Sequence, residues 1–166
     1  LVGEGNTVRG VDNLSTGNPE ALHPDVHFTR GDVKDRPKLW TLLQEVDCVY
    51  HLAARVLVPE SILYPREYNA TNVGGTVNVL EAVRDCPDVR AAVVITSDKC
   101  YENREWAWGY RENDPMGGND PYSASKGCAE LVFSAPGYGY DPTYNAGPGA
   151  VYEIFGSKDF FNQKSL

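Results

Sequence analysis

The sequence predicts an α/β fold built on a doubly wound parallel sheet, and two observations support this prediction. Apolar runs of strand length alternate along the chain with segments of helical periodicity. The apolar runs also lack the alternation of polar and apolar residues that a half-exposed strand shows. Continuous apolar strands are typical of a parallel sheet that helices cover on both faces.

The expected elements follow one another in strand–helix order. Strands are expected at residues 6–13, 26–33, 47–54 and 91–97, and helices at 36–46, 68–86 and 120–133. In the first two helices, apolar residues recur at helical spacing: Leu39, Leu42, Leu43 and Val46, then Val73, Val77, Leu80 and Val83. The third helix is expected to begin at Asp120-Pro121, because proline is well tolerated in the first turn of a helix.

The composition is that of a globular domain with an acidic balance. The 166 residues are 42% hydrophobic and 23% charged, with a formal net charge of −8. This charge argues against nucleic acid or an anionic membrane surface as a partner. No apolar run approaches the roughly 20 residues of a membrane span. The four cysteines form no CxxC pair, so we expect reduced thiols, no metal site and a cytoplasmic location.

Residues suited to a dinucleotide follow the first two expected strands. A carboxylate at Asp12 can accept hydrogen bonds from the adenosine ribose and would repel a 2′-phosphate, which favours NAD over NADP. Asp32 is placed to reach the adenine amino group. The neighbours Asn13 and Val33 belong to the same expected cofactor site. Each carboxylate has an alternative role, Asp12 in a turn and Asp32 as a cap of the next segment.

The third expected strand ends in Leu52, Ala53 and Ala54, and such small residues let a cofactor pass close to the backbone. Asn72 lies beside two glycines, and it is expected either to fix a local backbone feature near the site or to lie at the surface. His51 is interpreted as a packed strand histidine rather than as a catalyst or metal ligand.

Tyr122 and Lys126 form a YxxxK motif, and residues four apart share one face of a helix. An ammonium near a phenol favours the phenolate, which can take a proton from a sugar hydroxyl as its hydride leaves. The alternative is a Tyr and a Lys on a solvated helix face. The motif follows a parallel strand that ends in hydroxyl residues, and this context favours the site.

The fourth expected strand ends in a hydroxyl, a carboxylate and an ammonium side by side. Ser97 can hydrogen-bond a sugar hydroxyl beside Tyr122. Asp98 can act as an acid if burial favours its protonated form, and Lys99 can act as a base if desolvation favours its neutral form. An acid and a base next to a redox centre suit elimination of water. The alternative is an ordinary surface pair of Asp98 and Lys99.

The two ends of the chain do not match a complete dinucleotide-binding fold. A strand and a Gly-rich turn should open such a fold, whereas Gly3-Glu4-Gly5 precedes a strand. Residues 135–166 form an unplaced Gly/Pro/Tyr-rich tail, in which only residues 149–156 could be a strand. We therefore expect residues 1–134 to be a partial NAD-binding domain with the catalytic residues, truncated at both ends.

The motifs GVDNLSTG, GDV, HLAA, NVGGTVNVLEA and YSASK resemble, in order and spacing, the extended short-chain dehydrogenase/reductase superfamily of NAD-dependent nucleotide-sugar epimerases and dehydratases. The resemblance covers residues 1–133 and implies a Rossmann-like fold, a substrate domain that is not recognisable here, and a homodimer through residues 73–83 and 123–133. Residues 95–132 resemble the CDP-D-glucose 4,6-dehydratase branch. In this family Asp98 is typical of dehydratases, and the following Lys99 is typical of that branch.

The resemblance implies conversion of CDP-glucose to CDP-4-keto-6-deoxyglucose, a precursor of deoxysugars in bacterial surface polysaccharides. Tyr122, with Lys126 and Ser97, would deprotonate the C4 hydroxyl while NAD⁺ takes the C4 hydride. Lys99 would then remove the C5 proton and Asp98 would protonate the leaving C6 hydroxyl. Residues 58–76 resemble UDP-glucose 4-epimerases more, so an epimerase remains an alternative. A catalytically inactive fragment is a further alternative.

Overall fold

The computed structural model describes residues 1–111 and 113–134. The predicted tail and its possible strand at residues 149–156 lie outside the described residues. Within the described ranges, no helix combines the length and the apolar character that crossing a membrane requires. The same ranges contain no group of three or more His, Cys, Asp or Glu side chains placed to hold a metal ion.

The predicted strands and helices occur in the predicted order, but no α-helix separates β1 from β2, and helix α2 was not predicted. The strands are β1 (Arg9–Asp12), β2 (His27–Arg30), β3 (Cys48–His51) and β4 (Ala91–Val94). The helices are α1 (Arg36–Leu42), α2 (Val58–Leu63), α3 (Pro65–Tyr68), α4 (Gly75–Arg84) and α5 (Pro121–Ser134), and a π-helical segment, η3 (Asn69–Gly74), joins α3 to α4. Short 3-10 turns occur at η1 (Val2–Glu4), η2 (Pro19–Ala21) and η4 (Asp98–Cys100).

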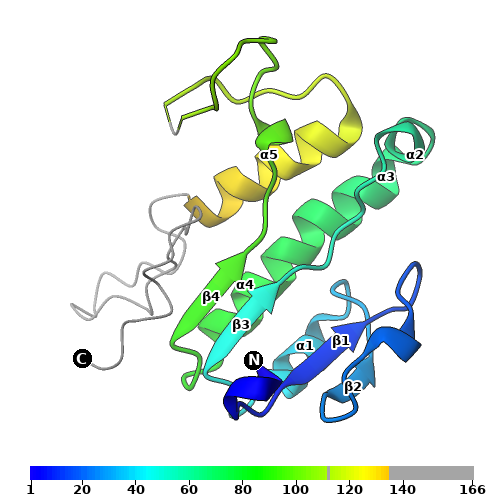
Figure 1. Ribbon diagram of the computed structural model, residues 1–166, viewed down its shortest axis with the longest axis vertical. Coiled ribbons are helices and arrows are strands. Elements are labelled where there is room, and N and C mark those ends of the chain that lie inside the picture. The colour runs from blue at the N-terminus through cyan, green and yellow to red at the C-terminus, as the bar shows by residue number, and fades with distance from the viewer. Residues whose placement is uncertain (112, 135–166) are drawn as a thin grey trace.

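The described strands pair in parallel, which confirms the predicted α/β class, but they form two separate two-stranded sheets. In one sheet β1 pairs with β2, and in the other β3 pairs with β4. The arrows of β1, β3 and β4 point the same way in Figure 1. The residues that follow the strands therefore lie toward one edge of the molecule, as expected for a ligand site in a parallel sheet.

Helices cover one face of the strands in the described part of the chain. Figure 1 shows α1 and α4 behind the strands and no helix in front of them. This differs from the expected cover on both faces. The reason lies in the β1–β2 connection, where Gly17, Pro19 and Pro24 interrupt any helix and leave only the short turn η2.

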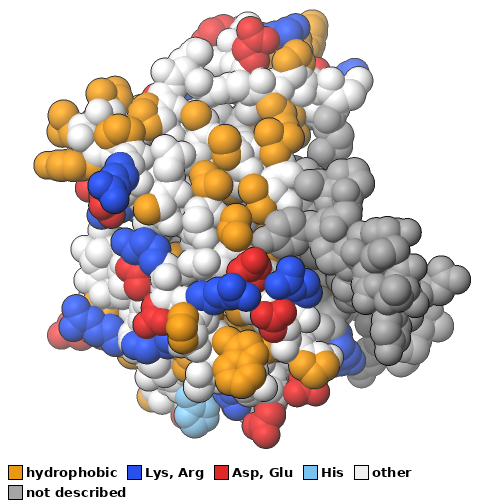
Figure 2. Space-filling model, turned by 180° about the vertical axis from the view of Figure 1, so that it is seen from behind, with side chains coloured by type: hydrophobic (Ala, Val, Ile, Leu, Met, Phe, Trp, Pro, Cys, Tyr) orange, Lys and Arg blue, Asp and Glu red, His pale blue; other side chains and the backbone are white. Residues whose placement is uncertain are grey.

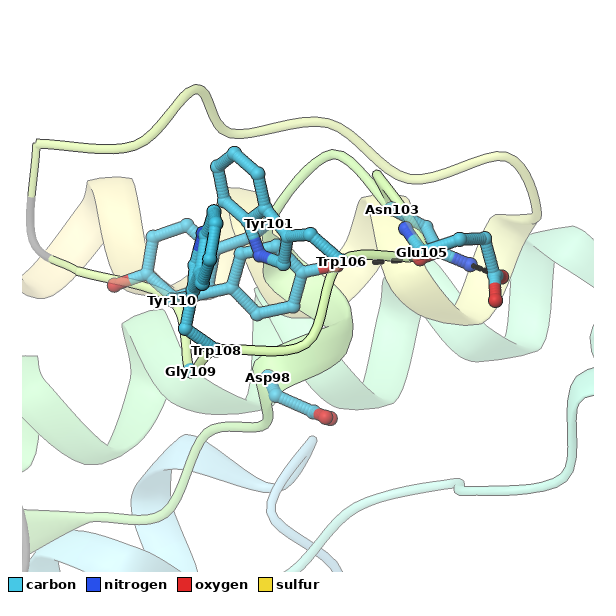
Figure 3. A pocket seen from close by; sticks show the side chains of 8 residues that line it. All are labelled: Asp98, Tyr101, Asn103, Glu105, Trp106, Trp108, Gly109 and Tyr110. Atoms are coloured by element: carbon cyan, nitrogen blue, oxygen red, sulfur yellow. Dashed lines mark hydrogen bonds between the residues drawn. The ribbon is translucent and has the colours of Figure 1, made fainter.

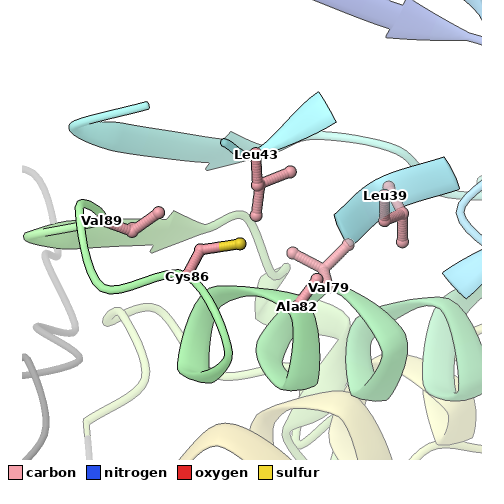
Figure 4. Close-up of a cluster of buried hydrophobic side chains, with 6 residues drawn as sticks. All are labelled: Leu39, Leu43, Val79, Ala82, Cys86 and Val89. Atoms are coloured by element: carbon pink, nitrogen blue, oxygen red, sulfur yellow. The ribbon is translucent and has the colours of Figure 1, made fainter. Parts of the chain in front are cut away.

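The main buried cluster joins α1 to α4 beneath β3. Its members are at most 9% exposed and are Leu39, Leu43, Val79, Ala82, Cys86 and Val89. Figure 4 shows the α4 side chains of this cluster pointing toward α1 and the strands. Burial of each large apolar side chain contributes about 1.5–3 kcal/mol. This cluster holds α4, and with it the segment η3, in a fixed position relative to β3.

Helix α5 begins as the Asp-Pro pair predicts. Asp120 accepts the backbone N–H of Ser123 at 2.9 Å and the hydroxyl of Ser123 at 2.6 Å. Side chains that accept the first free N–H groups stabilise a helix start. The segment before α5 packs closely against the first turn of the helix, because a Cβ at Gly118 would lie 2.6 Å from the backbone nitrogen of Ala124. The position of Tyr122 in the first turn is thus set by local geometry.

The face opposite to that of Figure 1 carries both apolar and charged side chains. Figure 2 shows a band of charged side chains of both signs across its lower half, with apolar side chains above, within and below the band. On the surface, Arg36 lies 3.0 Å from Glu81 and 3.3 Å from Asp85, so ion pairs link α1 to α4. Cys128 and Leu131 are exposed on α5. The homodimer expected through α4 and α5 stays a prediction.

Candidate active site

Ser97, Asp98 and Lys99 follow β4 in the turn η4. Ser97 caps this turn, because its Oγ accepts the backbone N–H of Lys99 at 3.2 Å. The same hydroxyl lies 3.3 Å from Asp98 Oδ1, to which it donates. Asp98 and Lys99 are both exposed. Asp98 and Lys99 therefore lack the burial that was expected to favour a protonated acid and a neutral base. Both side chains are accessible to a ligand.

Tyr122 and Lys126 lie on the buried side of α5, at 8% and 7% exposure. The Lys126 ammonium donates to the carbonyl oxygen of Ile95 at 3.0 Å, which holds it at the carboxyl end of β4. Burial lowers the pKa of Lys126 from its ordinary value of 10.5. The alternative of a solvated YxxxK face is therefore wrong.

Tyr68, which the sequence analysis missed, supports the ring of Tyr122. The two rings meet edge to face with their centroids 6.4 Å apart. Tyr68 has no exposed surface, and its hydroxyl donates to Glu60 at 2.8 Å while lying 2.7 Å from the carbonyl oxygen of Leu57. Burial and the hydrogen bond to the Glu60 carboxylate raise the pKa of Tyr68. Tyr68 is therefore held in place and packs against the ring of Tyr122.

Asn72 joins three parts of the site. Its side chain accepts the backbone N–H of Arg55 at 2.8 Å and donates to the Arg55 carbonyl at 3.0 Å. It also donates to the Ser125 hydroxyl at 2.8 Å, and Ser125 donates in turn to the Tyr122 carbonyl at 2.7 Å. Asn72 is 2% exposed, so it fixes the local backbone and does not lie at the surface. Its π-helical setting is frequent at functional sites.

His51 is a packed strand histidine, as interpreted from the sequence. It is 6% exposed, and its Nε2 lies 3.0 Å from the Thr76 hydroxyl oxygen. Since that hydroxyl donates to the Asn72 carbonyl at 2.7 Å, it accepts from His51, and Nε2 carries the proton. Burial, together with the charge of Lys126, lowers the pKa of His51 from 6.5 to about 4.

The low pKa of His51 predicts an acid-sensitive fold. Between pH 6.5 and about 4 the unfolded chain binds a proton that the folded protein excludes, so stability falls as pH falls across this window. The slope is about 1.4 kcal/mol per pH unit for one proton. Urea unfolding at several pH values measures it. The His51→Gln variant, which keeps a donor for Thr76, should lose this slope, and an unchanged slope would contradict the assignment to His51.

The expected cofactor residues after β1 form a tight turn. Asp12 Oδ1 accepts the backbone N–H of Leu14 at 2.6 Å, and Asn13 Oδ1 accepts that of Ser15 at 2.9 Å. Leu14 has a φ of 60°, and a Cβ at Gly17 would lie 3.0 Å from Asp12 Oδ2. The turn role of Asp12 is therefore present. Asp12 is exposed, so its carboxylate also remains accessible.

The residues after β2 are tied to their neighbours. Asp32 accepts from the Asn13 side chain at 3.0 Å and from the Lys34 backbone at 2.9 Å. Although burial opposes it, these hydrogen bonds and the Lys34 charge lower the pKa of Asp32. Val33 packs against the buried cluster, and a Cβ at Gly75 would lie 2.6 Å from its Cγ2. Asp32 therefore does serve as a local cap, and the Val33 side chain is a core residue.

Apolar surface lies uncovered where β3 and β4 end. Leu52 is 67% exposed and Ile95 is 48% exposed, and Ala53 is exposed as well. The backbone N–H of Ile95 donates to the His51 carbonyl at 3.1 Å, so the two strand ends are adjacent. Such a surface beside a buried Tyr–Lys pair suits the flat ring of a cofactor.

The predicted residues thus form two groups in the described structure. One group joins Asp12 and Asn13 to Asp32, and the other joins Lys126, Tyr122 and Asn72 around the end of β4. Helix α5 packs on η4, since a Cβ at Gly127 would lie 3.5 Å from the Cys100 carbonyl. No hydrogen bond or ion pair among the described residues links Asp98 or Lys99 to Tyr122. A bound substrate would have to bridge them.

A sequence model of the NAD dependent epimerase/dehydratase family matches residues 1–145. The chain belongs to this family. Membership confirms the resemblance inferred from the motifs, including the association with NAD that the family's description states. The model match also extends past the last described residue of α5.

Two curated members of the family illustrate the range of related activities. A CDP-glucose 4,6-dehydratase of Salmonella typhimurium is 57% identical over 107 residues, which are 63% of this chain and 30% of that protein. A UDP-glucose 4-epimerase of Lactobacillus helveticus is 33% identical over 136 residues, which are 81% of this chain and 41% of that protein. The chain thus spans less than half the length of either relative.

Solved structures of the family share the fold. The dTDP-glucose 4,6-dehydratase DesIV of Streptomyces venezuelae, with NAD bound, gives a TM-score of 0.70 at 32% identity, over 76% of this chain and 40% of that one. A UDP-glucose 4-epimerase of Brucella ovis in complex with NAD gives a TM-score of 0.75 at 28% identity, over 84% and 42%. These similarities confirm the Rossmann-like fold class.

Proposed function

We propose that this chain carries the catalytic centre of an NAD-dependent nucleotide-sugar 4,6-dehydratase that acts on CDP-glucose. The observation that carries the proposal is the placement of an accessible Asp98 and Lys99 in the turn that follows β4, the strand whose end holds Lys126. Epimerisation needs no acid to expel a hydroxyl, whereas dehydration does. The identity of 57% to a CDP-glucose 4,6-dehydratase supports the same substrate.

The described residues fit parts of NAD. The exposed carboxylate of Asp12, with Asn13 and Asp32 beside it, suits the adenosine end. The uncovered Leu52 and Ile95, at 67% and 48% exposure, suit the nicotinamide end near Lys126. Bound there, NAD⁺ supplies a hydride acceptor for C4 of the sugar and a hydride donor for C6.

Tyr122 serves as the base that takes the proton of the C4 hydroxyl. Lys126, one helical turn further along α5, places its ammonium at the end of β4, held by the Ile95 carbonyl at 3.0 Å. Ser97 donates to or accepts from the C4 hydroxyl. Tyr68 keeps the Tyr122 ring in place through the edge-to-face contact at 6.4 Å. These residues leave a ketone at C4.

Lys99 and Asp98 serve in the elimination of water. The C4 ketone acidifies the C5 hydrogen, and Lys99 removes that proton when the bound sugar and cofactor exclude water from its exposed side chain. The C5 electron pair forms the C5–C6 double bond while the C6–O bond breaks, and Asp98 protonates the departing hydroxyl to give water. Return of hydride to C6 and of a proton to C5 completes CDP-4-keto-6-deoxyglucose. Only water is lost, and the cofactor is regenerated.

A UDP-glucose 4-epimerase is the second candidate, because relatives of that activity match a larger share of the chain. One covers 81% of it, against 63% for the dehydratase. In an epimerase, the Tyr122 step would be followed by rotation of the ketone and return of hydride to C4. Asp98 and Lys99 would then have no chemical role.

The test is to incubate the protein, as its gene encodes it, with NAD⁺ and in turn CDP-, UDP- and dTDP-glucose. We expect CDP-glucose to lose one water by mass spectrometry and to give the ultraviolet absorbance of a 4-keto sugar in base. Formation of a galactose epimer with no loss of water would instead establish the epimerase. Dehydration of another nucleotide sugar in preference to CDP-glucose would overturn the substrate assignment alone.

A further inference from the structure

A pocket opens beside η4 and shares Asp98 with the proposed catalytic centre. It has a volume of about 650 Å³. Its lining residues are Asp98, Tyr101, Asn103, Glu105, Trp106, Trp108, Gly109 and Tyr110. Figure 3 shows the four aromatic side chains gathered together, with Asn103 and Glu105 at one end and Asp98 below them. We call residues 101–110 the aromatic loop.

The aromatic loop is held in shape by its own contacts. Tyr101, which is 8% exposed, stacks on Tyr110 with ring centroids 5.3 Å apart and an interplanar angle of 14°. The Tyr110 hydroxyl donates to Asn103 at 3.2 Å. At the base of the loop, the Glu102 N–H donates to the Pro115 carbonyl at 2.9 Å. A pocket formed before a ligand arrives costs less ordering on binding.

The pocket offers aromatic faces to a ligand. Trp106 lies between Trp108 and Tyr110, at centroid distances of 6.1 and 5.8 Å. Trp108 is 66% exposed, a large apolar area for a residue that usually is well covered. The indole N–H of Trp106 is buried and has no hydrogen-bond partner among the described residues. These features suit a ligand with an apolar face and with hydroxyl groups that can accept and donate hydrogen bonds.

The charges of the lining select a neutral ligand. Among the described residues, the charged members of the lining are Asp98 and Glu105, and no Lys or Arg is one of them. The nearby Arg104 is paired with Glu102 at 3.0 Å, and its guanidinium lies 5.4 Å from the centre of the Trp106 ring. A diphosphate would be repelled here, whereas carboxylates and an amide accept hydrogen bonds from sugar hydroxyls.

We propose that the aromatic loop binds the hexose of the nucleotide sugar, with an apolar face of the sugar ring stacked on Trp108. The C–H bonds of that face meet the negative face of the indole ring. The hydroxyls turn toward Asn103, Glu105 and Asp98. This inference rests on the proposed function, which brings the C6 hydroxyl to Asp98. It assigns to the loop the choice of sugar rather than the choice of nucleotide.

Binding tests the assignment without catalysis. Tryptophan fluorescence of the NAD-loaded protein is titrated with CDP-glucose and with CDP, and the part lost in Trp108→Phe is the signal of Trp108. We expect CDP-glucose to change this signal and CDP to leave it unchanged. An equal response to both would place the nucleotide in the pocket and overturn the proposal.

Steady-state kinetics test the same assignment, because it predicts a change in KM for CDP-glucose without a change in kcat. Trp108→Ala is expected to raise KM for CDP-glucose about tenfold, as loss of one stacking contact does, while kcat and the inhibition constant of CDP stay within about twofold. Trp108→Phe should restore most of the KM. The control is Trp40→Phe, a similarly exposed tryptophan on α1 at 48% exposure, which should change none of these values.

The outcomes separate this inference from the proposed function. If no nucleotide sugar is dehydrated but the Trp108 signal still distinguishes CDP-glucose from CDP, the dehydratase assignment fails and the pocket assignment stands. If dehydration proceeds and Trp108→Ala leaves KM unchanged, the pocket assignment fails and the dehydratase stands.

Discussion

Replacing Asp98 with Asn is expected to lower the rate of dehydration of CDP-glucose by about 10²–10⁴-fold, the usual contribution of a general acid. Asn has nearly the same shape, and its amide oxygen can still accept the Ser97 hydroxyl, which lies 3.3 Å from Asp98 Oδ1. It cannot donate the proton that the leaving C6 hydroxyl needs. Oxidation at C4 depends on Tyr122 and Lys126 and should continue, and the absorbance of reduced nicotinamide measures it.

Asp88→Asn is the matched control, because Asp88 is an exposed carboxylate in the turn between α4 and β4. It should leave both steps unchanged. Full dehydration by Asp98→Asn would show that Asp98 is not the acid. Equal loss of C4 oxidation and of dehydration would show that the substitution disturbs the turn η4, and would equally contradict the division of roles between Asp98 and Tyr122.

Local signals explain which parts of the fold could be predicted. Helix α5 was predicted from Asp120 and Pro121, and the structure confirms the cap at 2.9 Å to the Ser123 N–H. The strands were predicted from apolar runs. The separation into two sheets was not predicted, because pairing between strands depends on contacts far apart in the sequence. Helices were expected on both faces of the sheet but cover only one face of the described strands. Gly17, Pro19 and Pro24 in the β1–β2 connection already argued against a helix there.

In the candidate site, too, residues marked by local sequence signals were predicted, and features that depend on tertiary contacts were not. Tyr122 and Lys126 were found because both lie on one helix face, four residues apart. Tyr68 was missed because its role comes from a tertiary contact with Tyr122, and no spacing in the sequence announces it. The assumed burial of Asp98 was wrong, since an apolar strand says nothing about cover over the turn that follows it. The aromatic loop lies within residues 95–132, which resemble one branch of the family, but its pocket was not predicted because it depends on how Tyr101 and Tyr110 stack.

Replacing Asn72 with Ala is expected to lower the free energy of unfolding by about 2–4 kcal/mol. The Arg55 N–H and carbonyl and the Ser125 hydroxyl would lose a partner at 2.8, 3.0 and 2.8 Å, in a place that is only 2% exposed. Urea unfolding measures the loss. Because Ser125 also donates to the Tyr122 carbonyl at 2.7 Å, the first turn of α5 should loosen and kcat should fall.

Asn69→Ala provides the control on the same π-helical segment. Asn69 is exposed and donates to the Pro65 carbonyl at 3.0 Å, so its loss should cost less than about 1 kcal/mol. Asn72→Asp should be the most damaging of the three, because it keeps the acceptor for Arg55, removes both donors and buries a charge beside Ser125. If Asn69→Ala and Asn72→Ala cost the same, the hydrogen bonds of Asn72 do not hold the Arg55 backbone and α5 together, and the fixed position of Tyr122 must come from its contact with Tyr68.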